Sequence, residues 1–136
     1  MKKIITLIAV ATLIIVSLNA CKKNDAQPTQ TTLQKIQAKW LLQNYLENDH
    51  YSGLDHIKNL TGGANDYLDF RTDGKVYVSL FGSKDTSTYA LSGDTKIVVD
   101  GVNIFDIKTL TENSFIIYQK DISGSDFLEQ TFTMKK

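Results

Sequence analysis

The sequence predicts an all-β domain in which eight antiparallel strands close into an up-and-down barrel, preceded by a short N-terminal helical turn. Apolar and polar residues alternate from Asp66 onward, which is typical of an antiparallel sheet with one buried face. Short turn sequences separate the alternating runs, including Asp73-Gly74 and Asp100-Gly101, which are strong hairpin signals. Closure of the sheet removes exposed strand edges, so we favour a barrel; a two-sheet sandwich is the alternative.

The helical turn is expected to start at Thr31 or Thr32, because a threonine side chain can cap the first free backbone N–H groups. Leu33, Ile36 and Trp40 follow at the spacing of one helical face. From Trp40 the sequence allows either a longer helix or a first strand, and we favour the strand because everything that follows is strand-like. In that strand the two alternating faces are Trp40, Leu42, Asn44 and Leu46 on one side and Leu41, Gln43, Tyr45 and Glu47 on the other.

The segment from His50 to Asn65 is long for a connection in a meander. We expect a short helix in it, capped by Ser52 and ended by Gly62-Gly63. Such a helix could act as a lid over a cavity or as a plug that completes the core, and the plug is the favoured interpretation.

The remaining strands are predicted from alternation and turn residues alone. Their ranges are 66–71, 75–81, 86–91, 95–99, 102–110, 114–120 and 127–135. The residues expected to point inward are Leu68, Phe70, Val76, Val78, Leu80, Tyr89, Leu91, Ile97, Val99, Phe105, Ile107, Phe115, Ile117, Leu128, Phe132 and Met134. Gln119 and Gln130 interrupt the pattern of the last two strands. Five tyrosines are expected outside the barrel or at its rim, namely Tyr45, Tyr51, Tyr67, Tyr77 and Tyr118.

The first 20 residues have the layout of a secretory signal, with Lys2-Lys3 ahead of an apolar run. The small residue Ala20 and the single cysteine, Cys21, follow that run and resemble the cleavage site of bacterial lipoprotein signals. We therefore expect cleavage between Ala20 and Cys21 and lipidation of the Cys21 thiol. An uncleaved membrane-spanning helix is the alternative, because the apolar run is near the lower length limit for a span.

The predicted organisation is a signal peptide over residues 1–20, a lipidated flexible tether over 21–32, and one barrel domain over 33–136. Residues 22–32 have no large apolar side chain and cannot offset the entropy of ordering. The mature chain would carry 13 basic and 15 acidic residues, which argues against nucleic-acid binding. We expect a monomer held at the cell envelope, at the outer membrane, through its lipid anchor.

The sequence contains no arrangement typical of catalysis. His50 and His56 are its two histidines, and a spacing of six does not put them on one helical face. No serine lies in a Gly-x-Ser-x-Gly motif. We therefore expect neither an enzyme nor a bound metal or cofactor.

The sequence resembles the lipocalin-like domain of small Gram-negative lipoproteins over roughly residues 36–136. The motifs that carry the resemblance are Ala38-Lys39-Trp40, Phe70-Arg71-Thr72-Asp73-Gly74, Tyr89-Ala90-Leu91, Ile107-Lys108-Thr109-Leu110-Thr111 and Phe132-Thr133-Met134-Lys135. Members of that family usually have Gly-x-Trp where this chain has Ala38-Lys39-Trp40. The resemblance implies an eight-stranded barrel at the cell envelope, and its motifs specify a fold more than a chemistry.

Two functions are compatible with this organisation. In the first, the barrel binds a small apolar or amphipathic ligand, lined by Trp40, Phe70, Val78, Tyr89, Phe105 and Ile117. In the second, the interior is filled and the protein binds or inhibits another protein through loops at Tyr51–Asn65, Gly82–Asp85 and Ile122–Asp126. An eight-stranded barrel is just wide enough for its own side chains, which slightly favours a filled interior.

Overall fold

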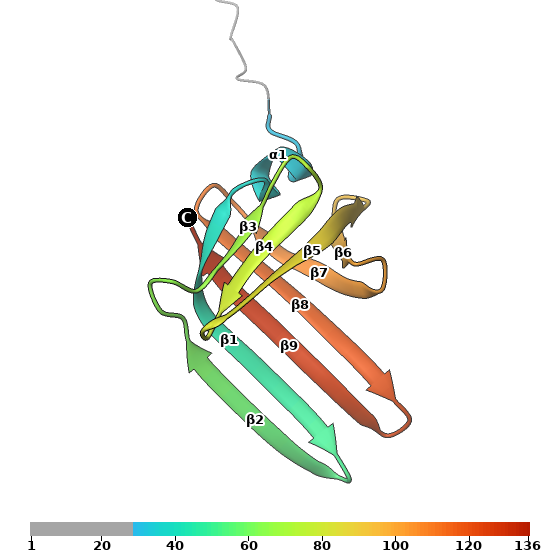
Figure 1. Cartoon of the computed structure of the whole chain (residues 1–136). Coiled ribbons are helices and arrows are strands. Elements are labelled where there is room, and N and C mark those ends of the chain that lie inside the picture. Colours follow the sequence, from blue (N-terminus) through green and yellow to red (C-terminus); the bar gives the residue numbers. More distant parts are fainter. Residues whose placement is uncertain (1–28) are drawn as a thin grey trace, which may run out of the picture.

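The computed structural model describes residues 29–136. The predicted signal peptide, Ala20, Cys21 and most of the tether lie outside these residues. One helix and nine strands follow one another along residues 29–136 (Figure 1). They are α1 (Thr32–Ile36), β1 (Lys39–Tyr51), β2 (Leu54–Thr61), β3 (Tyr67–Phe70), β4 (Lys75–Leu80), β5 (Ser83–Ser92), β6 (Lys96–Val99), β7 (Asn103–Leu110), β8 (Ser114–Ser123) and β9 (Asp126–Lys135).

Eight of the strands, all except β2, close into an antiparallel barrel, as predicted. Each of the strands from β3 to β9 pairs with the next, and β1 pairs with β3 on one edge and with β9 on the other. The β1–β9 ladder runs from Leu41 opposite Lys135 to His50 opposite Phe127. Closure therefore depends on pairing between the first and last strands of the sheet.

The predicted helix between His50 and Asn65 is wrong, because the chain forms strand β2 there. Ser52 and Gly53 both have positive φ angles, 54° and 78°, as a tight two-residue hairpin turn requires. β2 then pairs with β1 from Tyr51 opposite Leu54 to Asn44 opposite Thr61. The segment is neither lid nor plug: seven of its eight strand residues are exposed, and only Leu60 packs against the core.

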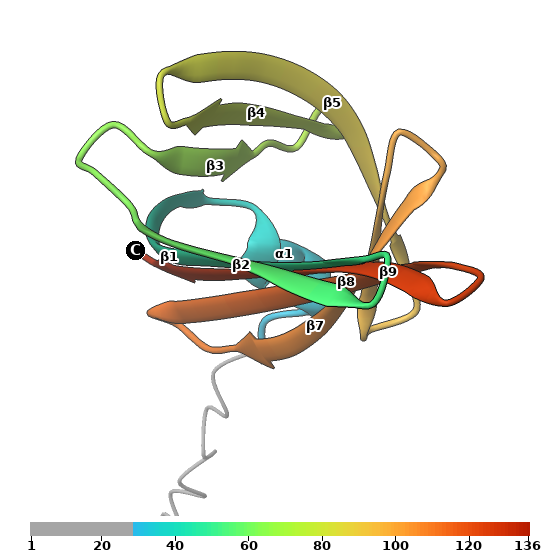
Figure 2. The ribbon, with the colours of Figure 1, turned by 90° about the horizontal axis from the view of Figure 1, so that it is seen from below.

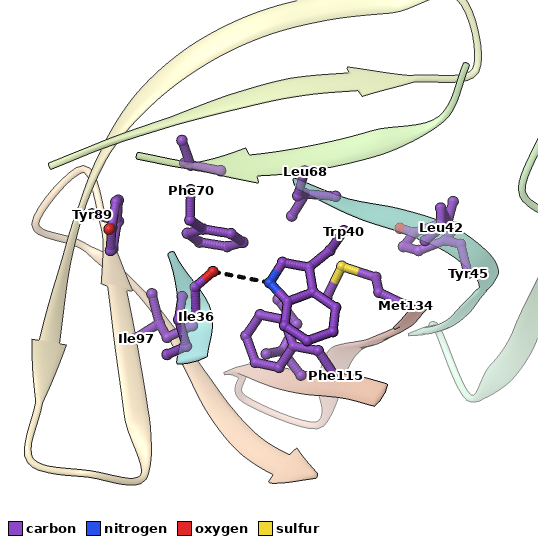
Figure 3. Packing of buried hydrophobic residues seen from close by; sticks show 12 residues of the cluster. Ile36, Trp40, Leu42, Tyr45, Leu68, Phe70, Tyr89, Ile97, Phe115 and Met134 are labelled. Atoms are coloured by element: carbon purple, nitrogen blue, oxygen red, sulfur yellow. Dashed lines mark hydrogen bonds between the residues drawn. The ribbon is translucent and has the colours of Figure 1, made fainter. Parts of the chain in front are cut away.

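The short helix α1 has the predicted position and cap. The Thr31 hydroxyl accepts a hydrogen bond from the Gln34 backbone N–H, and the Gln34 side chain accepts one from the Thr31 N–H, which forms a capping box. Ile36 ends the helix and is fully buried. Its carbonyl oxygen accepts a hydrogen bond of 2.9 Å from the Trp40 indole N–H (Figure 3), which ties the helix to the start of β1.

The core confirms nearly all of the predicted inward-facing residues. Trp40 packs against Phe115 with 5.1 Å between ring centres, and Phe70 packs edge-on against both Phe115 and Tyr89 (Figure 3). The buried apolar residues are Ile36, Trp40, Leu42, Tyr45, Leu68, Phe70, Val76, Tyr89, Ile97, Phe115, Ile117 and Met134. Leu128 was predicted to be part of this core; it is only partly buried and is not among the residues that pack there.

A β-bulge in β1 changes which residues face inward. Leu42 lies opposite Met134, but the next β9 residue, Thr133, lies opposite Asn44, so Gln43 is an extra residue on β1. The inward face therefore passes from Leu42 to Tyr45. The prediction that Tyr45 lies outside or at the rim is wrong, since it is 6% exposed. Leu46, which simple alternation puts on the same face as the buried Trp40 and Leu42, is 39% exposed.

Four strands extend beyond the barrel at the end opposite α1 (Figure 1). β1 exchanges β3 for β2 as its neighbour from Asn44 onward, and β8 has no pairing with β7 beyond Tyr118. The result is a flat extension with the order β2–β1–β9–β8. Viewed from below, β3, β4 and β5 lie as a layer over β1, β8 and β9 (Figure 2).

Candidate functional site

The six side chains predicted to line a ligand cavity lie in or against the packed core. Trp40, Phe70 and Ile117 are buried, and Phe105 packs against Phe132 with 6.0 Å between ring centres. Tyr89 is also buried, and its hydroxyl donates to the Arg71 carbonyl oxygen at 2.8 Å. Aromatic rings of the protein itself therefore occupy the space that a ligand would need.

Two of the six also border hollows that open at the surface. Tyr89 borders a hollow of about 370 Å³ beside α1, together with Leu33 and Leu91. Val78 borders one of about 430 Å³ that Tyr67, Tyr77 and Lys84 also line. A neighbouring hollow of about 490 Å³ shares two of these residues and is lined by Asn65, Asp66, Tyr67, Ser79, Gly82 and Lys84.

The strongest candidate for a functional surface is the extension beyond the barrel, which we call the distal platform. It comprises residues 46–51 of β1, 54–59 of β2, 119–123 of β8 and 126–131 of β9. Its two hairpin turns, β1–β2 and β8–β9, lie side by side at the end of the molecule farthest from α1 (Figure 1).

Contacts between the hairpins hold the end of the platform together. The Ser52 backbone N–H donates to the Asp126 carboxylate at 3.2 Å. The His50 ring stacks on Phe127, with ring centres 4.8 Å apart and planes 5° apart. The Lys120 ammonium group lies 4.1 Å from the centre of the same phenyl ring. The platform is therefore an ordered continuation of the sheet.

Large apolar side chains are concentrated on this platform. Among residues 29–136, nine large hydrophobic side chains are exposed, and five of them belong to the platform. The five are Leu46, Tyr51, Leu54, Ile57 and Ile122, with exposed fractions from 39% to 69%. Leu46, Ile57 and Ile122 lie on the outer face of the platform, the face that continues the outside of the barrel. Leu46 alternates with the buried Tyr45, Ile57 lies opposite Asn48 on the same face of β1, and Ile122 lies opposite Phe127 on the same face of β9. Clustered apolar side chains of this kind mark protein-binding surfaces.

The platform is also acidic. Its 23 residues include six acidic side chains and two basic ones. Asp49, Asp121 and Asp126 border a small hollow of about 160 Å³ between the hairpins, beside the His50 and Phe127 rings. A partner that carries positive charge would complement this surface.

A partly buried polar network lies where the platform joins the barrel. The Tyr45 hydroxyl donates to the Glu47 carboxylate, and the Gln130 amide donates to both, at 2.7 Å and 3.1 Å. Burial, reinforced by the hydrogen bond to Glu47, raises the pKa of Tyr45 well above its usual value of 10.0. The same hydrogen bond lowers the pKa of Glu47 below 4.5. Gln130, which interrupted the predicted apolar pattern, is therefore the hydrogen-bond partner of the buried Tyr45 and of the partly buried Glu47.

The two histidines lie on opposite faces of the β1–β2 hairpin. His50 pairs with Asp55 at 2.7 Å on the outer face, whereas His56 lies opposite Asp49 on the inner face. Within residues 29–136 no group of three or more histidine, cysteine, aspartate or glutamate side chains is arranged to hold a metal ion. In the same part of the chain no helix has the length and hydropathy needed to cross a membrane.

The platform joins two of the three segments that the sequence suggested for partner binding. Tyr51–Asn65 and Ile122–Asp126 meet at its end (Figure 1). The third segment, Gly82–Asp85, was predicted as a loop and is mostly strand: only Gly82 lies in the turn after β4, and residues 83–85 begin β5 and pair with β4. The sequence interpretation missed β2 itself. The signal was present as Ser52-Gly53 between two polar–apolar runs, which indicates a turn as well as a helix cap.

Comparison with known proteins finds no matching family model and no matching curated protein.

Proposed function

We propose that the protein is a cell-envelope lipoprotein whose barrel presents the distal platform to a partner protein. The observation that carries this proposal is the concentration of exposed apolar side chains on the platform, while the barrel interior is filled by Trp40, Phe70 and Phe115. A barrel with a filled interior can act as a rigid support. The exposed apolar side chains of the platform are the surface that a partner protein would cover.

The position of the platform agrees with attachment through Cys21. The described chain enters the barrel through α1, and the platform lies at the opposite end (Figure 1). Eleven peptide units join the Cα atoms of Cys21 and Thr32, so an extended chain between them spans at most about 40 Å. A lipid at Cys21 would therefore keep α1 within reach of the membrane and leave the platform accessible from the other side.

The chemistry of the platform defines the partner. The exposed apolar residues supply the part of an interface that is buried from water, and aromatic and aliphatic anchors of this kind often contribute most of the binding free energy. The excess of acidic side chains favours a partner surface with lysine or arginine at its rim, which speeds association and excludes acidic competitors.

Site-specific photocrosslinking in the native cells tests the proposal. A photoreactive residue at Ile122, 64% exposed on the platform, should give one discrete protein adduct. The same residue at Val102, which is 75% exposed between β6 and β7, is the matched control and should give none. Substitution of Leu46 and Ile57, which share the outer face with Ile122, by serine should remove the Ile122 adduct. Adducts of equal yield at both positions, or an adduct unaffected by the serine substitutions, would contradict the proposal.

Binding of a small apolar ligand is the second candidate, and the hollow beside α1 is the observation that favours it. Leu33, Tyr89 and Leu91 give that hollow an apolar border. Native mass spectrometry of protein purified from its own membrane should detect a retained molecule if this function holds. Replacement of Leu91 by tryptophan should then displace the molecule without weakening the crosslink at Ile122.

A further inference from the structure

The outer edge of β2 is an unpaired sheet edge on the distal platform. β2 pairs with β1 along its whole length and has no other neighbour among the described strands. It is eight residues long, contains no proline, and is exposed on both faces. Most natural edge strands are short, covered or distorted, because an open edge offers backbone hydrogen bonds to any extended chain.

The alternation of hydrogen bonds along the β1–β2 ladder shows which backbone N–H and C=O groups of β2 are free to bind another strand. The Gly62 N–H donates to the Gln43 carbonyl oxygen at 3.1 Å, which continues the β1–β2 register. Hydrogen-bonded pairs alternate along an antiparallel ladder, so the even-numbered residues of β2 bond to β1. The backbone N–H and C=O groups of Asp55, Ile57 and Asn59 therefore point away from β1 toward the free edge.

The side chains along the edge define what could pair there. Leu54 and Ile57 are 64% and 69% exposed, and they lie on opposite faces of β2. An added strand would extend both faces, placing its residues directly opposite these apolar groups and opposite Asp55. The acidic excess of the platform favours lysine or arginine beside Asp55 and disfavours pairing with a second copy of the same acidic surface.

We propose that β2 binds an extended segment of a partner protein by strand addition, and that this segment places apolar residues opposite Leu54 and Ile57 and lysine or arginine opposite Asp55. The proposal rests on the partner-binding function inferred above and names the mode of recognition. In strand addition the backbone hydrogen bonds supply affinity, and the alternating side chains supply specificity.

Amide hydrogen exchange, measured by NMR on the full chain in detergent, tests the proposal with a designed probe. The probe is the peptide Thr-Val-Lys-Thr-Val-Thr-Lys-Val, which places lysine opposite Asp55 and valine opposite Leu54, Ile57 and Leu60 in antiparallel register. At millimolar peptide the amides of Asp55, Ile57 and Asn59 should exchange at least about tenfold more slowly, whereas those of His56 and Lys58 should be slow with or without peptide. The same peptide with proline for its central valine should have no effect.

Two variants of the protein separate strand addition from simple apolar contact. Ile57→Pro removes an N–H that points to the free edge and leaves the pairing with β1 intact, so it should abolish the peptide-induced protection. Ile57→Val keeps that N–H and an apolar side chain, and should retain the protection. Equal thermal unfolding midpoints of the two variants would verify that both fold.

The remaining outcomes overturn the proposal in distinct ways. Unchanged exchange at Asp55, Ile57 and Asn59 with the valine peptide would exclude strand addition at this edge. Protection of these amides without peptide, together with a concentration-dependent dimer in sedimentation, would assign the edge to a second copy of the chain. An Ile122 crosslink that persists in Ile57→Pro cells would leave the partner-binding function standing and remove strand addition as its mode.

Discussion

Gly62 lies against the backbone of Leu42, so closely that a Cβ atom at position 62 would be 2.2 Å from the Leu42 carbonyl oxygen. Leu42 is the residue just before the bulge in β1, and Gly62 follows the last residue of β2. The absence of a side chain at Gly62 thus allows the end of β2 to approach the point where the inward face of β1 changes phase.

Gly62→Ala is expected to destabilise the protein by roughly 1–3 kcal/mol, because backbone must move to accept the methyl group. Gly63→Ala is the matched control, since its Cβ would meet the nearest atom, an Asp66 carboxylate oxygen, at an ordinary 3.4 Å. Urea denaturation of the two variants measures the difference. Equal free energies of unfolding would show that the Gly62 contact is not required.

Trp40→Ala is expected to cost about 3–5 kcal/mol of unfolding free energy, because it removes a fully buried indole from the centre of the core. Trp40→Phe should cost less, since it keeps a ring against Phe115 and loses only the hydrogen bond to Ile36 and part of the volume. Chemical denaturation followed by circular dichroism measures both. A loss below about 1 kcal/mol for Trp40→Ala would contradict the packing described for the barrel.

Glu47 should make the protein sensitive to acid. Its pKa is below 4.5 in the folded state because of the hydrogen bond from Tyr45, so the unfolded chain binds a proton more readily than the folded one. The stabilisation from Glu47 is complete above pH 4.5 and is lost as the pH falls through the lower folded-state pKa. The free energy of unfolding of Glu47→Gln should therefore fall less than that of the unchanged protein between about pH 6 and about pH 3.

Tyr45→Phe provides the companion measurement. It removes the hydroxyl that lowers the Glu47 pKa, so it should also weaken the acid dependence while keeping an aromatic ring against Phe132. If Glu47→Gln and Tyr45→Phe both kept the full acid dependence, other carboxylates would have to account for it.

Cys21→Ser should abolish metabolic labelling with a radioactive fatty acid and leave an uncleaved precursor, if Cys21 is the lipidated residue. A matched substitution in the predicted tether, Asn24→Ser, should change neither. Labelling that persists in Cys21→Ser would contradict the lipoprotein assignment. This experiment does not involve the platform, so its outcome is independent of the crosslinking result.

Local chemistry made most of the strands predictable. Alternation in segments such as Lys75–Leu80 and Lys96–Val99 can bury only one face of a sheet, and Asp100-Gly101 has the positive φ angles, 52° and 73°, that its turn requires. The same alternation predicts side-chain direction, and it correctly places Phe70, Ile97 and Phe115 in the core without information on strand pairing. Each of these features depends on residues only a few positions apart.

The sequence by itself thus determined the fold class, the eight barrel strands and most of the core, because period-two alternation and turn residues act locally. Tertiary structure decided the bulge at Gln43, the strand β2 and the distal platform. The physical reason is that all three depend on pairing between segments distant in the sequence. The register between β1 and β9 leaves Gln43 without a partner residue, and β1 continues beyond the end of β3, so β2 pairs with the rest of that edge. The surface proposed for partner binding exists only because β2, β1, β9 and β8 pair with one another beyond the barrel.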